Sequence, residues 1–404
     1  MQKIIIERPY EFIPPHRGNW WPTLIQWLQL YAKHLRTKEG VGSFEIRNAD
    51  RLRESLQAGH GILLTPNHCR TADPLVMGWL ARDVGTHVFA LASWHLFNQD
   101  KFSAWAIHKM GGFSVYREGI DRPAIDTAIA ILESAERPLI IFPEGTTSRT
   151  NDRLQALLDG VGFIARAAAK KRAKHGAGKV VIHPIALKYL FAGDLDMALG
   201  PVLTEIERRF TWRSQDDQPL YDRIIKIGRT LLCLKEIEYF GRVQEGRLTE
   251  RVQRLIDRLL HPLELEWLGS HQQGAVVPRI KNLRMKIVPD MVKGTIAPVE
   301  RDRRWRQLTD IYLSQQVSSY PPDYLERPTV ERLLETVERY EEDLMDKSRA
   351  HGKLKVIIQV GEAIEVTPER DRKADTDPLM TRLAQDLQGM LDELAKESTL
   401  YVPR

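Results

Sequence analysis

The chain has 404 residues, of which 43% are apolar and 28% are charged, the composition of an ordinary globular protein long enough for one or two domains. The formal net charge of +5 is modest for this length and basic clusters lack interleaved aromatic residues, so nucleic-acid binding is not predicted. Cys69 and Cys233 suggest no disulfide framework, and no secretory leader is recognised at the start, so we expect a reducing, cytoplasmic location.

The first predicted element is a helix over residues 20–35, rich in Trp and Leu and followed by basic Arg36 and Lys38. No stretch of about eighteen uninterrupted apolar residues occurs, so a membrane-spanning helix is not expected. The helix suits an interfacial anchor that makes the protein peripheral on the cytoplasmic membrane face. Packing of the same stripe as protein core is the alternative. Residues 1–45 are assigned to this amphipathic segment.

Between about residues 60 and 190, strand-like runs alternate with helical stretches. Strands are predicted at 61–65, 86–92, 113–116, 138–142 and 180–190, and helices at 74–84, 101–110, 122–134 and 152–174. This alternation predicts an α/β fold with a mostly parallel sheet flanked by helices. Residues 46–195 are assigned to this core.

The loop after the strand at 61–65 carries His68 and Asp73, five positions apart. A neutral imidazole takes a proton near neutral pH, since its unperturbed pKa is about 6.5. A nearby carboxylate fixes the tautomer of the ring and stabilises the imidazolium, as in hydrolase triads. No Gly-x-Ser-x-Gly elbow lies nearby, so the pattern favours a bound acceptor alcohol as nucleophile, and transfer rather than hydrolysis. A structural histidine at a strand end is the alternative.

A second loop, residues 142–149, follows the strand at 138–142 and offers the Glu144 carboxylate, backbone donors and hydroxyls. In open α/β sheets the carboxyl ends of the strands carry the site, so the two loops are predicted to share one cleft. A metal is not predicted, because His68 lacks a second histidine at zinc-site spacing, although His60 and Cys69 are close in sequence.

Four blocks, in order, resemble the glycerolipid acyltransferase family, which acylates lysophosphatidic acid and glycerol phosphate. The first and third are specific, matching the family's Asn-His-x-x-x-x-Asp and Phe-Pro-Glu-Gly-Thr patterns. The second, similar to Gly-x-x-Phe-Ile-x-Arg, and the fourth, a strand with a single proline, are weaker. The matched positions are Asn67, His68, Asp73, Gly111, Arg117, Pro143, Glu144, Gly145, Thr146 and Pro184.

This resemblance implies an O-acyltransferase of phospholipid biosynthesis. It would move a fatty acyl group from an acyl thioester, acyl-CoA or acyl carrier protein, to a hydroxyl of a lipid acceptor such as lysophosphatidic acid. No cofactor beyond this co-substrate is implied. His68 would be the general base and Asp73 would hold its ring. The implied acceptor and phosphate site consists of Arg117, Glu144, Gly145, Thr146 and Arg149.

Three positions depart from the family pattern. Thr147 stands where an arginine usually follows Glu-Gly-Thr, with Arg149 two residues later, while Ser114 replaces an aromatic residue and Arg70 replaces a serine. A different, non-lysophosphatidate acceptor is therefore the first alternative. The second is a non-catalytic lipid- or carrier-binding module on the same fold.

Residues 351–404, a strand, a turn, a strand and a helix over 377–394, resemble the closing segment of the acyltransferase domain. Residues 196–350 would then be a helical insertion, with amphipathic stretches such as 220–232 and 252–260 and no apparent repeat period. The insertion either caps the cleft against water or serves packing or dimerisation.

Two basic clusters are candidate contacts for anionic lipid or an acidic carrier. The first consists of Arg166, Lys170, Lys171, Arg172, Lys174 and Lys179. The second, in the insertion, consists of Arg279, Lys281, Arg284 and Lys286. For the first cluster the alternative is a solvated helix end whose cations complement the carbonyl dipole.

Overall fold

In a computed structural model of the chain, the described residues are 5, 7–176, 178–211, 213–321, 323–345, 347, 349–370 and 376–403. The chain divides into two compact units. The α/β unit contains Tyr10–Ala192 and Lys353–Glu397, so two separate segments build it. The helical unit contains the described part of Gly193–Gly352, with the described residues before Tyr10 and after Glu397. Parts of the predicted segments 1–45 and 351–404, namely 1–4, 6, 371–375 and 404, lie outside the described residues.

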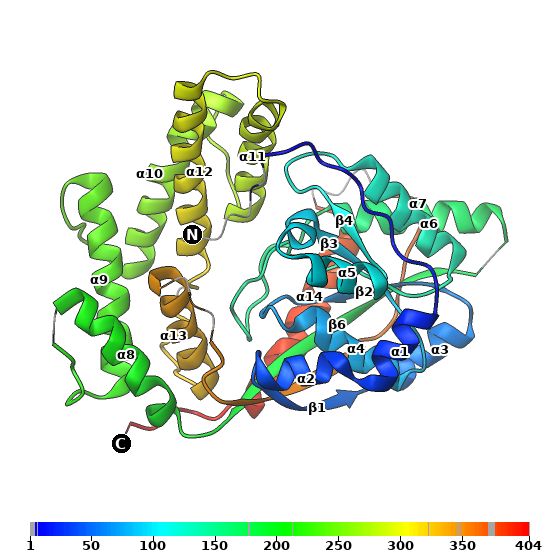
Figure 1. Cartoon of the computed structure of the whole chain (residues 1–404), viewed down its shortest axis with the longest axis horizontal. Helices are drawn as coiled ribbons and strands as arrows, with labels where there is room; N and C mark the ends of the chain where they lie inside the picture. Colours follow the sequence, from blue (N-terminus) through cyan, green and yellow to red (C-terminus); the bar gives the residue numbers. More distant parts are fainter. Residues whose placement is uncertain are drawn as a thin grey trace. The chain divides into compact units, whose positions relative to one another are not determined.

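Within the described ranges, eight strands form one sheet in the α/β unit (Figure 1). They are β1 (Val41–Arg47), β2 (Gly61–Pro66), β3 (Phe89–Ser93), β4 (Gly112–Val115), β5 (Leu139–Ile140), β6 (Val180–Ala192), β7 (Lys353–Val360) and β8 (Ile364–Glu365). The order is β1-β7-β6-β2-β5-β3-β4, and β8 also pairs with β6. Strands β6, β2, β5, β3 and β4 are parallel, whereas β7 and β8 run antiparallel to β6. This mostly parallel sheet confirms the predicted α/β class.

The helices of the α/β unit are α1 (Trp20–Leu28), α2 (Leu30–Thr37), α3 (Ala49–Gln57), α4 (Asp73–Asp83), α5 (Lys101–Lys109), α6 (Arg122–Ser134), α7 (Gly160–Lys174) and α14 (Pro378–Leu394), with short turns η1 (Trp94–Asn98) and η2 (Ala395–Glu397). Helices α6, α7 and α14 share one apolar core with the strands, in which Leu132, Ile164 and Leu383 pack with Leu63 and Ile182. Full burial of such a side chain stabilises the fold by roughly 1.5–3 kcal/mol. This apolar core therefore holds in place the strands whose ends carry the two polar loops.

Two predicted helices differ from the structure. The stretch 20–35 forms two helices, because Gln29 adopts a left-handed conformation with φ of 48°. The helix predicted over 152–174 begins only at Gly160. Asp152, the first residue of the predicted helix, is held outside it because its side chain pairs with Lys188 of β6, and Asn151 just before it donates from Nδ2 to the Tyr189 carbonyl. Strand β1 and helix α3 have no counterpart among the predicted elements.

The helical unit contains α8 (Leu195–Thr211), α9 (Leu220–Phe240), α10 (Leu248–Leu268), α11 (Val276–Lys293), α12 (Pro298–Ser318) and α13 (Val330–Met345). Leu260, Leu283 and Ile311, from α10, α11 and α12, are fully buried in one apolar core. None of the helices in the described ranges combines the length and apolar character needed to cross a bilayer.

The helical unit also contains an internal repeat, which corrects the expectation of no repeat period. A glutamate late in one helix accepts hydrogen bonds from Nε and Nη2 of an arginine early in the next. The pairs are Glu207–Arg223, Glu236–Arg251 and Glu264–Arg279. Each glutamate also accepts from a backbone N–H in the intervening loop, namely that of Gln215, Gln244 and Gln272 respectively. This pattern of a glutamate, a loop amide and an arginine recurs about every 28 residues, a period typical of tandem helical repeats.

Candidate active site

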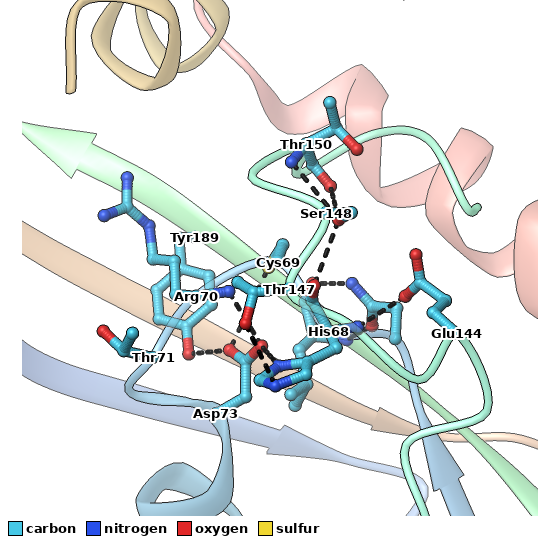
Figure 2. Close-up of polar contacts among 12 residues, drawn as sticks. His68, Cys69, Arg70, Thr71, Asp73, Glu144, Thr147, Ser148, Thr150 and Tyr189 are labelled. Carbon is cyan, nitrogen blue, oxygen red and sulfur yellow. Dashed lines mark hydrogen bonds and ion pairs between the residues drawn. The ribbon is translucent and has the colours of Figure 1, made fainter. Parts of the chain in front are cut away.

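The two polar loops leave the same edge of the sheet. Strand β2 pairs in parallel with β5 through Leu63 and Leu139, so the residues after each strand emerge side by side at the carboxyl end. The first loop connects β2 to α4, and the second, which includes residues 142–149, continues from β5 to the start of α7 at Gly160. The structure thus brings His68 and Glu144 together, as Figure 2 shows.

His68 and Asp73 form a hydrogen-bonded pair (Figure 2). Nδ1 of His68 lies 2.9 Å from Oδ2 of Asp73, a contact that requires the proton on Nδ1 when the ring is neutral. Asp73 is fully buried at the start of α4, and the His68 side chain is 17% exposed. The Phe142 ring lies 4.2 Å from the imidazole, centroid to centroid. The ring is therefore oriented by a carboxylate and supported on one face while it keeps access to solvent.

The second loop fixes the backbone of His68 on both sides. The backbone N–H of His68 donates to Glu144 Oε1 at 2.6 Å. The carbonyl of His68 accepts from the backbone N–H of Ser148 at 2.7 Å and from the Ser148 hydroxyl at 3.1 Å. These contacts tie the two loops together around the imidazole.

Glu144 lies at the centre of this clamp. It is fully buried, and its Oε2 accepts from the backbone N–H of Gln155 at 2.9 Å. Burial raises the pKa of Glu144 to about 8, with the Asp73 charge acting in the same direction and the two backbone donors opposing it. With both oxygens engaged by backbone amides, this carboxyl braces the loops.

Strand β6 anchors both loops through asparagine side chains. Pairing of β2 with β6 ends at Pro66 and Ile185, which leaves the next backbone groups on that side of β6 without a strand neighbour. The Asn67 side chain takes the place of that neighbour for Leu187. The Leu187 backbone N–H donates to Asn67 Oδ1 at 2.7 Å, and Asn67 Nδ2 donates to the Leu187 carbonyl at 3.1 Å. Asn151 does the same for Tyr189. The predicted motif residue Asn67 thus continues the sheet beyond the end of β2.

Thr147 contacts the other nitrogen of the imidazole. Its Oγ1 lies 3.2 Å from His68 Nε2, on the side of the ring away from Asp73. This is the distance at which an alcohol gives up a proton to a general base. Thr147, a departure from the family pattern, therefore places a hydroxyl beside the ring nitrogen that does not face Asp73.

Arg117 follows β4, which is separated from β2 in the sheet by β5 and β3. With strands about 4.8 Å apart, this places the two strand ends roughly 14 Å from each other. The Arg117 side chain is partly exposed, and no hydrogen bond or ion pair joins it to another described residue. Burial lowers the pKa of its guanidinium, while the charge of Glu118 acts in the opposite direction.

Three other predicted positions have local structural reasons. Gly145 has a φ of 69°, a conformation that strains other residues, and a Cβ there would also push against the Leu158 side chain, so glycine is favoured at this turn. At Gly111, with φ of 91°, a Cβ would meet the Val88 carbonyl at 2.6 Å. Pro184 lies between the residues of β6 that pair with β8 and those that pair with β7, and its carbonyl accepts from the Gly361 N–H.

The remaining motif residues lie in or beside the second loop. Pro143 is buried, Thr146 is half-buried, and Arg149 adopts a left-handed conformation with φ of 57°. The departure Ser114 is fully buried on β4, where its Oγ accepts from the backbone N–H of Ile13 at 2.8 Å and lies 3.0 Å from the Tyr10 hydroxyl. Ser114 thus ties the N-terminal segment to the strand that leads to Arg117.

Sequence reasoning does not identify Ser148, Asn151 or Tyr189 as part of the site. The Tyr189 hydroxyl donates to Asp73 Oδ1 at 2.6 Å, across 116 positions of sequence. Ser148 lies two residues after the motif that ends at Thr146 and is one of the loop hydroxyls that the sequence offers, which is the signal that points to it. Among the described residues, no group of three His, Cys, Asp or Glu side chains is arranged to hold a metal ion.

The two basic clusters do not present all their cations to solvent. Arg166 is buried and pairs with Asp377, while Arg172 donates to the carbonyls of Gly59, Glu133 and Gly178. Arg279 and Arg284 are likewise buried, and Arg279 belongs to the repeat pair with Glu264. The arginines of both clusters therefore stabilise the fold, which leaves the lysines as exposed charges.

The comparison with known families agrees with this geometry. Residues 44–188 match the family model described as Acyltransferase, and this range contains the His68–Asp73 pair and the second loop. The match supports acyl transfer as the class of reaction. No curated protein matches the chain.

Proposed function

We propose that the chain is an O-acyltransferase in which the His68–Asp73 pair activates an acceptor hydroxyl. The observation that carries the proposal is the arrangement around the ring: Asp73 Oδ2 lies 2.9 Å from Nδ1, and a hydroxyl, that of Thr147, lies 3.2 Å from Nε2. A base held by a carboxylate, with an alcohol at its other nitrogen, is the geometry of general base catalysis. The Acyltransferase match at residues 44–188 supports the same reaction class.

In the proposed reaction, His68 Nε2 removes the proton from the acceptor alcohol as its oxygen attacks the thioester carbonyl. The C–O bond forms, the C–S bond breaks, and the imidazolium returns the proton to the leaving thiolate. Asp73 stabilises the imidazolium between these steps. The donor is an acyl thioester, acyl-CoA or acyl carrier protein, and the reaction belongs to phospholipid biosynthesis.

We further propose that the acceptor carries a phosphate bound by Arg117, as in lysophosphatidic acid. The Arg117 guanidinium is partly desolvated, and although the charge of Glu118 acts on it, it forms no hydrogen bond or ion pair with another described residue, so its fork of donors can match phosphate oxygens. The parallel strands direct both the Arg117 loop and the His68 loop to the same edge of the sheet.

A panel of acceptors tests this proposal. The protein is incubated with labelled long-chain acyl-CoA or acyl carrier protein and lysophosphatidic acid, glycerol 3-phosphate or a neutral monoacylglycerol, and the products are identified by mass. We expect the phosphate-bearing acceptors to be preferred. Arg117→Met should raise the KM for them by roughly 10- to 100-fold, the usual value of a charge-assisted contact, with kcat changed less.

Thr147 favours a second candidate, acylation of an acceptor without phosphate. A small neutral side chain, instead of a second arginine, lies beside the reactive nitrogen and adds no positive charge there. Preference for the neutral acceptor, with no effect of Arg117→Met, would select this candidate. Absence of transfer to every acceptor would leave a non-catalytic lipid- or carrier-binding module.

We also propose a peripheral association with membrane lipid through an aromatic patch on α1 and α5, defined by Trp20, Trp27, Phe102 and Trp105. Trp20, Trp27 and Phe102 are 64%, 74% and 74% exposed. Trp21 joins the two helices, with its ring 4.4 Å from that of Trp20 and 5.0 Å from that of Trp105. Exposed tryptophans with basic residues nearby, here Lys101 at the start of α5, suit the interface of an anionic bilayer.

A further inference from the structure

Asp73 is surrounded by donors, and one of them comes from outside both motif loops. Oδ2 accepts from His68 Nδ1 at 2.9 Å and from the backbone N–H of Arg70 at 2.8 Å. Oδ1 accepts from the Tyr189 hydroxyl at 2.6 Å, and the Cys69 thiol lies 4.0 Å from it. Figure 2 shows Tyr189 reaching Asp73 on the side of the carboxylate away from the imidazole.

Tyr189 is built to remain a donor. It is almost fully buried on β6, and its backbone is tied to the second loop through Asn151. Burial, followed by the charge of Asp73, raises the pKa of Tyr189 well above its usual value, which keeps the hydroxyl a donor to the carboxylate. The Arg70 guanidinium lies 5.4 Å from the ring centroid and holds it from one face.

We propose that Tyr189 is a positioning residue that fixes Asp73 and limits how strongly this carboxylate attracts the protonated imidazole of His68. This inference rests on the proposed function, in which His68 must be neutral to accept a proton. A hydrogen bond to Oδ1 withdraws charge from the carboxylate, and the remaining charge holds the imidazolium less tightly. Loss of the Tyr189 hydroxyl should therefore strengthen the hold of Asp73 on the imidazolium.

Other ionisable groups surround the His68–Asp73 pair. Cys69 and Arg70 come from the loop that carries the pair, Glu144 comes from the loop after β5, and Tyr189 comes from β6. Arg70 donates from its backbone N–H to Asp73, and the Glu144 carboxyl accepts from the backbone N–H of His68 rather than from its ring. Among the side chains on this face, Tyr189 makes the short direct contact with Asp73 besides that of His68 itself.

Tyr189→Phe removes the hydroxyl and keeps the ring. We expect the acid limb of the kcat/KM profile to move to higher pH by roughly half a unit to one unit, the size of one hydrogen bond. At the plateau kcat should fall by about 3- to 30-fold with the KM values changed less than about threefold, because Tyr189 does not touch substrate. Tyr31→Phe, which removes a buried hydroxyl that donates to the Gly78 carbonyl on α4, is the matched control and should leave the profile unchanged.

A direct NMR titration of the His68 ring keeps this inference separate from the assigned activity. In Tyr189→Phe the midpoint should move to higher pH, and in an Asp73→Asn background Tyr189→Phe should move it no further, since the effect passes through the carboxylate. An unchanged midpoint in a folded Tyr189→Phe protein would overturn the role of Tyr189, whatever the activity. A shifted midpoint in a protein without acyl transfer would overturn the proposed function and leave this inference standing.

Discussion

At the scale of single residues, the hydroxyl of Thr147 separates two ways of using the same imidazole. If the Thr147 hydroxyl only lies where the acceptor alcohol binds, the rate of acyl transfer by Thr147→Val should stay within about tenfold of the wild-type rate, since one neutral hydrogen bond is lost. If Thr147 were itself acylated, transfer would vanish. Steady-state kinetics of Thr147→Val and intact-mass analysis of the protein after exposure to acyl-CoA check this. A mass increase of one acyl group on the wild type, absent in the variant, would contradict direct transfer.

The buried carboxyl of Glu144 should make the stability of the folded protein depend on pH. Its pKa in the folded protein, about 8, lies above the ordinary 4.5, so the folded state retains a proton that the unfolded chain releases between these values. The stability contributed by this group is therefore fully present below about pH 4.5 and declines as pH rises to about 8. Glu144→Gln cannot titrate, and its Tm should decline less than that of the wild type between pH 5 and 8. Parallel Tm curves would count against this.

The sequence predicts contacts of the site between residues that are close along the chain. It does not predict contacts between residues that only the fold brings together. His68 and Asp73 are five positions apart, so their contact follows from local spacing. The contact of Tyr189 with Asp73 spans 116 positions and depends on the register of β6 against β2, which no local pattern encodes. Glu144 is found as a motif residue, but its contact with the His68 backbone becomes visible only when the loops meet.

At the scale of elements, the buried pairs of the repeat should be the weak points of the helical unit. Glu264 is fully buried and accepts from Arg279 and from the Gln272 backbone. Glu264→Ala leaves the buried Arg279 with only the longer ion pair to Asp257, at 3.5 Å, which should destabilise the unit by about 3 kcal/mol. Hydrogen exchange of the α10 and α11 amides measures this.

Glu238→Ala is the control for that variant. Glu238 is exposed on α9 and pairs only across one helical turn with Lys235, so its loss should change stability by no more than about 0.5 kcal/mol. Equal exchange rates in the Glu264→Ala and Glu238→Ala proteins would show that the repeated pairs do not hold the helices together.

The sequence predicts the ends of a helix correctly where the hydrophobic pattern determines them. The prediction is wrong where contacts of polar side chains determine them. Helix α6 begins and ends where the sequence predicts, because its apolar period and capping Asp121 agree. Helix α7 starts eight residues late, since Asn151 and Asp152 are held by β6. The repeat is hidden because it lies in spaced buried charges, which hydrophobic periodicity does not detect.

At the scale of the whole molecule, the aromatic patch predicts binding to lipid. Replacing Trp20, Trp27 and Phe102 by serine removes the most exposed rings and should abolish sedimentation with anionic phosphatidylglycerol vesicles at low salt. Phe163→Ser on α7 removes a ring of similar exposure, 60%, outside the patch and should have no effect. Binding that survives the triple substitution would exclude the patch as the lipid contact.

The claim on which the account rests is that the His68 imidazole, held by Asp73, is the base of an acyl transfer reaction. The most direct measurement is the rate of acyl transfer from acyl-CoA to lysophosphatidic acid by purified His68→Ala protein, with its folding verified by thermal unfolding. We expect the rate to fall by about 100- to 10,000-fold, the usual contribution of a general base. A folded His68→Ala protein that transfers acyl groups at the wild-type rate would contradict the account.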